Sequence, residues 1–123
     1  MAINTQFHTQ GNVLIATSSG FDEGLNEAIH YNDLVLKQAI SNDCAKVVCD
    51  ERTLEYRLSL IDTYTLGKHM AERIHFIRHI AIVSDKRHDE IVMFWENVTT
   101  NRGVSAKVFF KVEDALSWMG SLK

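Results

Sequence analysis

The clearest strand in the sequence is His79-Ile80-Ala81-Ile82-Val83-Ser84, where apolar and mostly β-branched residues follow one another. An uninterrupted apolar run of this length is typical of a strand that is covered on both faces. A helix is predicted after it, because apolar residues recur on one helical stripe at Ile91, Phe94, Trp95 and Val98. Gly103 is a suitable end for that helix, since glycine enters the left-handed conformation without a steric penalty.

The same alternation of strand and helix extends towards the N-terminus. Residues 45–50 are short and β-branched and predict a buried strand, and residues 22–42 carry the three-and-four spacing of a helix that starts at Asp22. After the strand at residues 45–50, a second helix is predicted to begin behind Ser59 and to run to about residue 74. Ser59 is expected to cap it, as in a capping box.

Both ends of the chain complete the pattern. Residues 3–9 and 13–16 predict an antiparallel hairpin, and Ser18, Ser19 and Gly20 are expected to end its second strand. At the other end, residues 106–110 predict the last strand and residues 115–119 a short helix.

The predicted order of elements is therefore ββαβαβαβα. Such an order indicates an α/β fold, with a mixed, mostly parallel sheet of about five strands, an antiparallel hairpin at its edge and helices packed on the sheet. A chain of 123 residues has the usual size of one domain, so residues 1–123 are expected to form a single domain.

Composition excludes several classes of protein. The formal charge of −3 argues against a nucleic-acid-binding protein, which needs a dense basic face. No apolar run approaches the roughly 20 residues of a membrane span, and no signal-peptide pattern opens the chain. Cys44 and Cys49 lie on one predicted strand at roughly 16 Å from each other, too far for a disulfide. We therefore expect a soluble, cytoplasmic protein in a reducing compartment.

Ligands of open α/β sheets bind beyond the carboxyl ends of the strands, so the predicted loops at 50–53 and 84–89 are examined first. Their polar side chains could contact a ligand or a partner, and backbone N–H groups beside the basic residues of the second loop could hold an anion. Charged loops are also common on any protein surface. The candidate binding residues are Asp50, Arg52, Ser84, Asp85, Arg87 and His88.

No catalytic or metal-binding constellation is found in the sequence. His75 and His79 have the spacing of a helical metal pair, but His79 begins a strand and no acidic or cysteine ligands complete the set. No glycine-flanked nucleophile or phosphate loop is present. We therefore predict no catalytic residue, metal or cofactor; an enzyme built on Asp50, Arg52, Asp85 and His88 is a third-ranked alternative.

The residues quoted so far carry a family resemblance from about residue 13 to residue 119. The run Val47-Val48-Cys49-Asp50-Glu51-Arg52, the strand Ile80-Ala81-Ile82-Val83, and the end Val108-Phe109-Phe110 with Ala115-Leu116-Ser117-Trp118-Met119 resemble the SpoIIAA-like family of small STAS-related domains. The resemblance implies an α/β fold and a role like that of bacterial STAS domains, which are phosphorylation-controlled protein-interaction switches.

One departure from that family concerns its switch serine, which sits in an Asp-Ser-Ser-Gly type loop after the third strand. This sequence has Asp50-Glu51-Arg52-Thr53 there, so no phosphorylation site is carried over. Ser59 and Thr53 are candidates by location alone, and capping already accounts for Ser59.

The sequence thus predicts a non-enzymatic regulatory or protein-interaction domain. Its partner is expected to be another protein or a second copy of itself, since twofold dimers are the commonest oligomers. The alternative is a small-ligand or lipid-binding carrier domain that uses the strand-end loops or an apolar cavity between sheet and helices.

Overall fold

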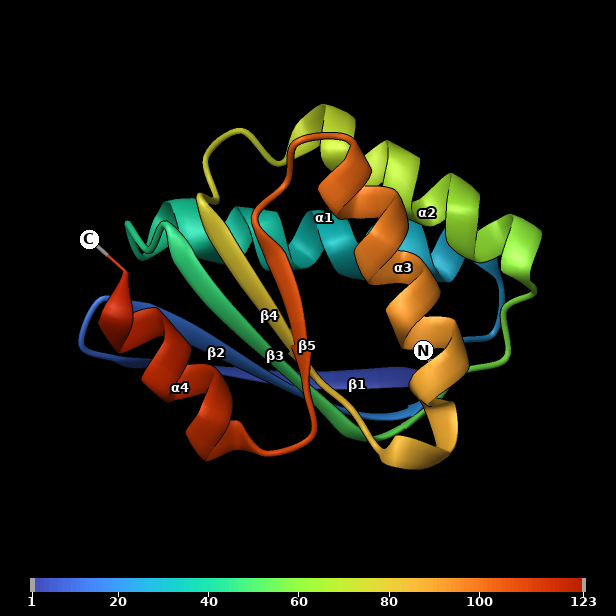
Figure 1. Cartoon of the computed structure of the whole chain (residues 1–123), viewed down its shortest axis with the longest axis horizontal. Coiled ribbons are helices and arrows are strands. Elements are labelled where there is room, and N and C mark those ends of the chain that lie inside the picture. Colours follow the sequence, from blue (N-terminus) through green and yellow to red (C-terminus); the bar gives the residue numbers. More distant parts are fainter. Residues whose placement is uncertain (1, 123) are drawn as a thin grey trace.

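A five-stranded sheet with helices on both faces forms the fold, as the computed structural model of residues 2–122 shows (Figure 1). In chain order the elements are β1 (Ile3–Gln10), β2 (Val13–Phe21), α1 (Leu25–Ser41), β3 (Lys46–Glu55), α2 (Leu60–Arg73), β4 (His79–Val83), the 3₁₀ turn η1 (Lys86–His88), α3 (Asp89–Asn101), β5 (Ala106–Phe109) and α4 (Val112–Ser121). The strands lie in the order β1-β2-β3-β4-β5; β1 and β2 are antiparallel, and all later pairs are parallel. The predicted α/β class, its mixed sheet and its antiparallel edge are confirmed.

The helices form two unequal layers. Figure 1 shows α1, α2 and α3 together on one face of the sheet and α4 alone on the other. Alternate residues of β4, which lies between β3 and β5, contribute to the two layers, with Ile80 and Ile82 in the core under α1–α3 and Ala81 and Val83 in the core under α4. The continuous apolar run that marked this strand in the sequence is explained by burial on both faces.

Local signals of the sequence are seen at the helix ends. The Ser59 hydroxyl accepts a hydrogen bond from the Asp62 backbone N–H at 3.1 Å and so caps α2 as predicted. Gly103 has a φ of 86° directly after α3, where a residue with a Cβ would be strained. Trp118 is half-buried on α4, in a tilted contact with Phe109 of β5.

Three predicted boundaries are wrong. The second strand does not end at Ser18 but continues to Phe21, and the third continues to Glu55, because the two strands keep pairing to the register Phe21↔Glu55. Asp50 and Arg52 therefore lie inside β3 and not in a loop. The first helix begins at Leu25, so Asp22 precedes it.

A β-bulge interrupts the pairing of β2 with β3. Thr17 pairs with Asp50 and Ser19 with Thr53, so β3 contains one more residue than β2 over this interval. An extra residue reverses the side-chain alternation beyond it. As a result Cys49 and Glu51, before the extra residue, and Leu54, after it, all face the layer of α1–α3.

Candidate ligand pocket

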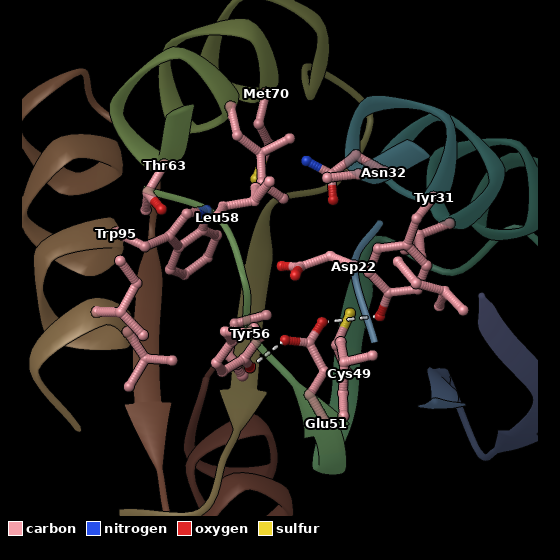
Figure 2. A pocket seen from close by; sticks show the side chains of 18 of the residues that line it. Asp22, Tyr31, Asn32, Cys49, Glu51, Tyr56, Leu58, Thr63, Met70 and Trp95 are labelled. Carbon is pink, nitrogen blue, oxygen red and sulfur yellow. Dashed lines mark hydrogen bonds between the residues drawn. The ribbon is translucent and has the colours of Figure 1, made fainter. Parts of the chain in front are cut away.

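A cavity of about 70 Å³ lies between the sheet and the three helices of the larger layer. A single water needs about 10–15 Å³ on this kind of measure, so the cavity has room for several waters or a small organic molecule. Its walls are mostly apolar, and Figure 2 shows Leu58, Met70 and Trp95 around the space. Mostly apolar walls with a few convergent polar groups are typical of small-molecule sites.

The polar end of the cavity is built around the carboxyl group of Glu51. Tyr31, from α1, donates its hydroxyl to Glu51 Oε2 at 2.8 Å, and Tyr56, just after β3, donates to Oε1 at 2.5 Å (Figure 2). Ser18 of β2 donates to the Tyr31 hydroxyl at 3.2 Å and is itself hydrogen-bonded to Thr5 of β1. Tyr31 of α1 and Tyr56 after β3 thus both bond one buried carboxyl, which is 6% exposed, and Ser18 and Thr5 extend the network behind Tyr31.

Burial raises the pKa of Glu51 to about 7, against the opposing effect of its two tyrosine hydrogen bonds. The charges of Asp22 and Asp50 raise it further. Burial, with the neighbouring acids, also raises the pKa of Tyr31 and Tyr56 well above their usual range. The tyrosines therefore act as neutral hydrogen-bond donors, while Glu51 changes charge near neutral pH.

Asp22 is the second acid of the cavity, at the end of β2. It is 5% exposed, and its Oδ1 accepts a hydrogen bond from the backbone N–H of Arg57. Burial raises the pKa of Asp22, and this hydrogen bond partly opposes the rise. The bond also fastens the segment after β3, which carries Tyr56 and Leu58, to the end of β2.

Two further polar atoms beside the cavity have no partner among the described residues. The Asn32 side-chain amide nitrogen, on α1, is buried without an acceptor, as is His88 Nε2. The His88 ring lies edge-on to the Tyr56 ring, with centroids 5.0 Å apart. Buried polar atoms normally have a partner, so an unpartnered donor on a cavity wall fits a site that takes up a ligand or ordered water.

Cys49 lies on the cavity wall beside Glu51 (Figure 2). Burial, with the charge of Glu51, raises the pKa of its thiol. A buried protonated thiol is a weak nucleophile, so this cysteine contributes shape and not reactivity.

The six residues proposed from the sequence do not gather at one place. Asp50 and Arg52 form a two-bond ion pair, with both donor–acceptor distances 2.9 Å. Neither lines the cavity, although Glu51 between them in the sequence does. Asp85 accepts from the Arg87 backbone N–H at 2.9 Å in the exposed turn η1. Ser84 is buried at the end of β4, and His88 packs against Tyr56. None of the six lines the pocket, and only Ser84 and His88 contact Tyr56, which does.

Six polar residues of the pocket are not among the site residues predicted from the sequence. They are Asp22, Tyr31, Asn32, Glu51, Tyr56 and Thr63. A signal for one of them existed: in a strand with Val47 and Cys49 facing the core, the alternation places Glu51 on the same face. The two tyrosines carry no such signal, because their approach depends on the bulge and on the packing of α1.

Residues 2–122 also bear on two other classes of protein, metal-binding proteins and membrane proteins. No group of three or more His, Cys, Asp or Glu side chains there is arranged to hold a metal ion. Within the same residues, no helix has the length and apolarity needed to cross a membrane.

Proteins similar to this chain are found among solved structures and not by sequence. No family model matches the chain, and no curated protein matches it by sequence. It is similar to the crystal structure of an anti-sigma factor antagonist from Mycobacterium paratuberculosis, at 13% identity and a TM-score of 0.68, over 97% of this chain and 95% of that one. It is also similar to an uncharacterised protein with a SpoIIAA-like fold from Shewanella loihica, at 16% identity and a TM-score of 0.58, over 95% of this chain and 93% of that one.

The protein is thus an α/β domain with helices on both faces of a mixed sheet. More narrowly, its fold is the SpoIIAA-like fold, and the resemblance drawn from the sequence is confirmed at the level of the fold.

Proposed function

We propose that the chain is a non-enzymatic regulatory domain that works by binding a partner protein, in the cytoplasm. The observation that carries this proposal is the fold shared, over nearly the whole chain, with a protein described as an anti-sigma factor antagonist. This is an analogy of fold, and function resides in sites and not in folds. Its test is therefore a direct search for a partner.

The start of α2 is the surface that we propose for this contact. Leu60, Ile61 and Tyr64 lie on its first turns with exposed fractions of 49%, 78% and 42%. Arg102 donates to the Tyr64 hydroxyl at 2.6 Å and so borders the apolar group with a positive charge. Aromatic and aliphatic side chains with an arginine beside them are typical of the central part of protein interfaces.

Affinity capture from the lysate of the source organism, followed by mass spectrometry, tests the proposal. We expect the wild-type chain to retain a specific protein, or a second copy of itself, that Ile61→Asp loses. Ile40→Asp is the matched control, because Ile40 is equally apolar and 53% exposed but lies at the opposite end of the helical layer, at the end of α1. Equal capture of a specific partner by all three chains would contradict the proposed surface, and no capture by any chain would contradict the proposed mode of action.

The cavity favours a second candidate function, the binding of a small ligand. Its supporting observation is the mostly apolar cavity with a polar end at Glu51. Native mass spectrometry of the freshly purified chain should then show a retained small molecule that denaturation releases. A mass equal to that of the chain alone, under conditions that preserve the fold, would count against this candidate.

A further inference from the structure

The cavity contains two acids and, among its lining residues, no base. We propose that it binds small molecules that carry a protonated amine on a short apolar chain, with the ammonium group between Glu51 and Asp22. This inference rests on the ligand-binding candidate and names its chemical class.

None of the residues that line the cavity is a cationic partner for these acids. Both hydrogen bonds to Glu51 come from neutral tyrosine hydroxyls, and the bond to Asp22 comes from a backbone N–H. The charge of Arg57 acts on Asp22, but its guanidinium forms its ion pair elsewhere, 3.2 Å from Glu55 and 3.7 Å from the centre of the Phe21 ring. Buried carboxylates are normally paired with a positive charge, and here a ligand would supply it.

The carboxyl groups of Glu51 and Asp22 also have free acceptor sites. A carboxylate offers about four lone-pair positions, and each oxygen of Glu51 accepts only one hydrogen bond from the protein. Asp22 Oδ1 accepts one, and no described residue donates to its Oδ2. A primary ammonium group has three N–H donors, which matches the vacant acceptors of two neighbouring acids. The two acids are close enough for the charge of Asp22 to act on Glu51.

The walls suit the rest of such a molecule. Trp95, Met70 and Leu58 present apolar surface around the polar end (Figure 2). The rings of Tyr31, Tyr56 and Trp95 also line the space, and the faces of aromatic rings attract cations. A cavity of about 150 Å³ is known to hold benzene, so one of about 70 Å³ limits the enclosed part to a few heavy atoms.

Competing ligand classes fit the same site less well. A carboxylate ligand would place a third negative charge beside Glu51 and Asp22, which Coulomb repulsion disfavours in a partly desolvated site. An alcohol could donate one hydrogen bond but would leave both acids without a countercharge. These two classes are the controls for the test.

The test is an NMR titration of the labelled wild-type chain with n-butylammonium, 1-butanol and butanoate at pH 8.5. At this pH a primary amine, with a pKa of about 10.4 in the lysine side chain, remains protonated. We expect the cross-peaks of Tyr31, Glu51 and Tyr56 to move with n-butylammonium, and the Kd for it to be at least tenfold lower than for either control. An equal or lower Kd for 1-butanol or butanoate would overturn the inference.

Variants assign the effect to the proposed residues. Glu51→Gln keeps the size of the side chain and removes its charge, and should raise the Kd for n-butylammonium about tenfold while leaving that for 1-butanol unchanged. Glu55→Gln makes the same change on the same strand at a half-exposed position outside the cavity, and should leave both Kd values as in wild type. Unchanged n-butylammonium binding by Glu51→Gln would contradict the assignment; the wild-type series decides the ligand class even where that variant does not fold.

The outcomes also separate this inference from the function beneath it. A retained ligand without an amine in native mass spectrometry, with no preference for n-butylammonium, would refute the inference and leave the ligand-binding candidate standing. No binding of any probe, together with an empty chain in native mass spectrometry, would refute both.

Discussion

Glu51 is the residue whose surroundings differ most from those of an ordinary strand residue. It is a carboxyl on the face of β3 that also carries the buried Val47, Cys49 and Leu54, and the hydroxyl groups of Tyr31 and Tyr56 satisfy it. A buried polar group without such partners would cost several kcal/mol. The hydrogen bonds therefore make the burial of Glu51 tolerable, and burial in turn makes its protonation sensitive to pH near neutrality.

Stability should consequently depend on pH through this residue. Its pKa is about 7 in the folded chain against 4.5 as the ordinary value, so the folded state holds more protons between these values and the free energy of unfolding falls as pH rises through them. At about 1.4 kcal/mol per pKa unit, the loss is on the order of 3 kcal/mol. Urea unfolding of wild type and Glu51→Gln at pH 4.5, 6, 7 and 8 measures it.

The expected result is a difference between the two chains that shifts in favour of Glu51→Gln as pH rises from 4.5 to 8. Glu55→Gln should follow the wild type throughout. A constant difference between wild type and Glu51→Gln over this range would show that the Glu51 carboxyl does not titrate as its burial requires.

The thiol of Cys49 offers a second measurement at this scale. It is 2% exposed beside Glu51, and burial raises its pKa, so a disulfide reagent should not modify it in the folded chain. In a Cys44→Ala background, labelling of Cys49 should proceed only as the larger helical layer opens, and should become fast in 8 M urea. Rapid labelling under native conditions would show that the cavity wall is open to solvent.

The bulge in β3 and the crossing of α2 over α3 are the decisive features at the scale of elements. The bulge turns residues on both sides of it towards one face, and the helix crossing covers that face. Gly67 of α2 lies at the crossing, where an added Cβ would come within 2.9 Å of Val98 Cγ1 on α3. The two helices are as close as the absence of a side chain permits.

Gly67→Ala should therefore destabilise the chain, although alanine is the better helix former. Overpacking typically costs about 1–3 kcal/mol, against a gain of about 1 kcal/mol in helix propensity. Gly120→Ala in α4 is the matched control, since no atom lies within 4 Å of its added Cβ, and it should be neutral or stabilising. Denaturant unfolding measures both, and Val98→Ala should partly restore Gly67→Ala; equal effects of the two glycine variants would exclude a close packing at the crossing.

Regular elements were predictable from the sequence, and their polar extensions were not. The apolar run of β4 and the cap at Ser59 depend on neighbouring residues alone, and both predictions are confirmed. The continuation of β2 through Ser18 is different, because this polar residue is buried only by virtue of its bonds to Thr5 and Tyr31. Local periodicity contains no information about such distant partners.

The same limit applies to the site. The sequence pattern places Asp50 and Arg52 after a strand, whereas the strand continues and the two side chains pair with each other. The pocket depends on Tyr31, twenty residues before Glu51, and on a bulge that no residue type announces. Whether Asp50, Arg52, Ser84, Asp85, Arg87 and His88 contact a partner stays a prediction.

The whole molecule has two cores of different kinds on the two faces of one sheet. The core under α1–α3 contains the cavity, while the smaller core under α4 is closed by Ala115 and Met119, which are 0% and 1% exposed. Lys46, at the start of β3, donates to the carbonyls of Met119 and Leu122 at 2.9 and 3.1 Å and fastens the end of α4. Stability and ligand binding should therefore be separable between the two faces.

Met119→Ala tests this separation. Removing a buried methionine side chain typically costs about 2–5 kcal/mol, which denaturant unfolding measures. Since Met119 lies on the opposite face from the cavity, the Kd for n-butylammonium should stay within twofold of wild type under native conditions. Met70→Ala changes the same residue type on a cavity wall and should alter that Kd; a change of similar size in both variants would contradict the separation.

The extra residue in β3 decides which side chains of the strand face each helical layer. Before the extra residue, the odd-numbered side chains Cys49 and Glu51 face the larger helical layer, and after it the even-numbered Leu54 does. Deleting one residue at the bulge would keep the strands, but Leu54 and Tyr56 would then face α4. Glu51 would lose the hydrogen bond that Tyr56 donates. A shift of one position in this strand would therefore keep the sheet and remove the polar end of its cavity.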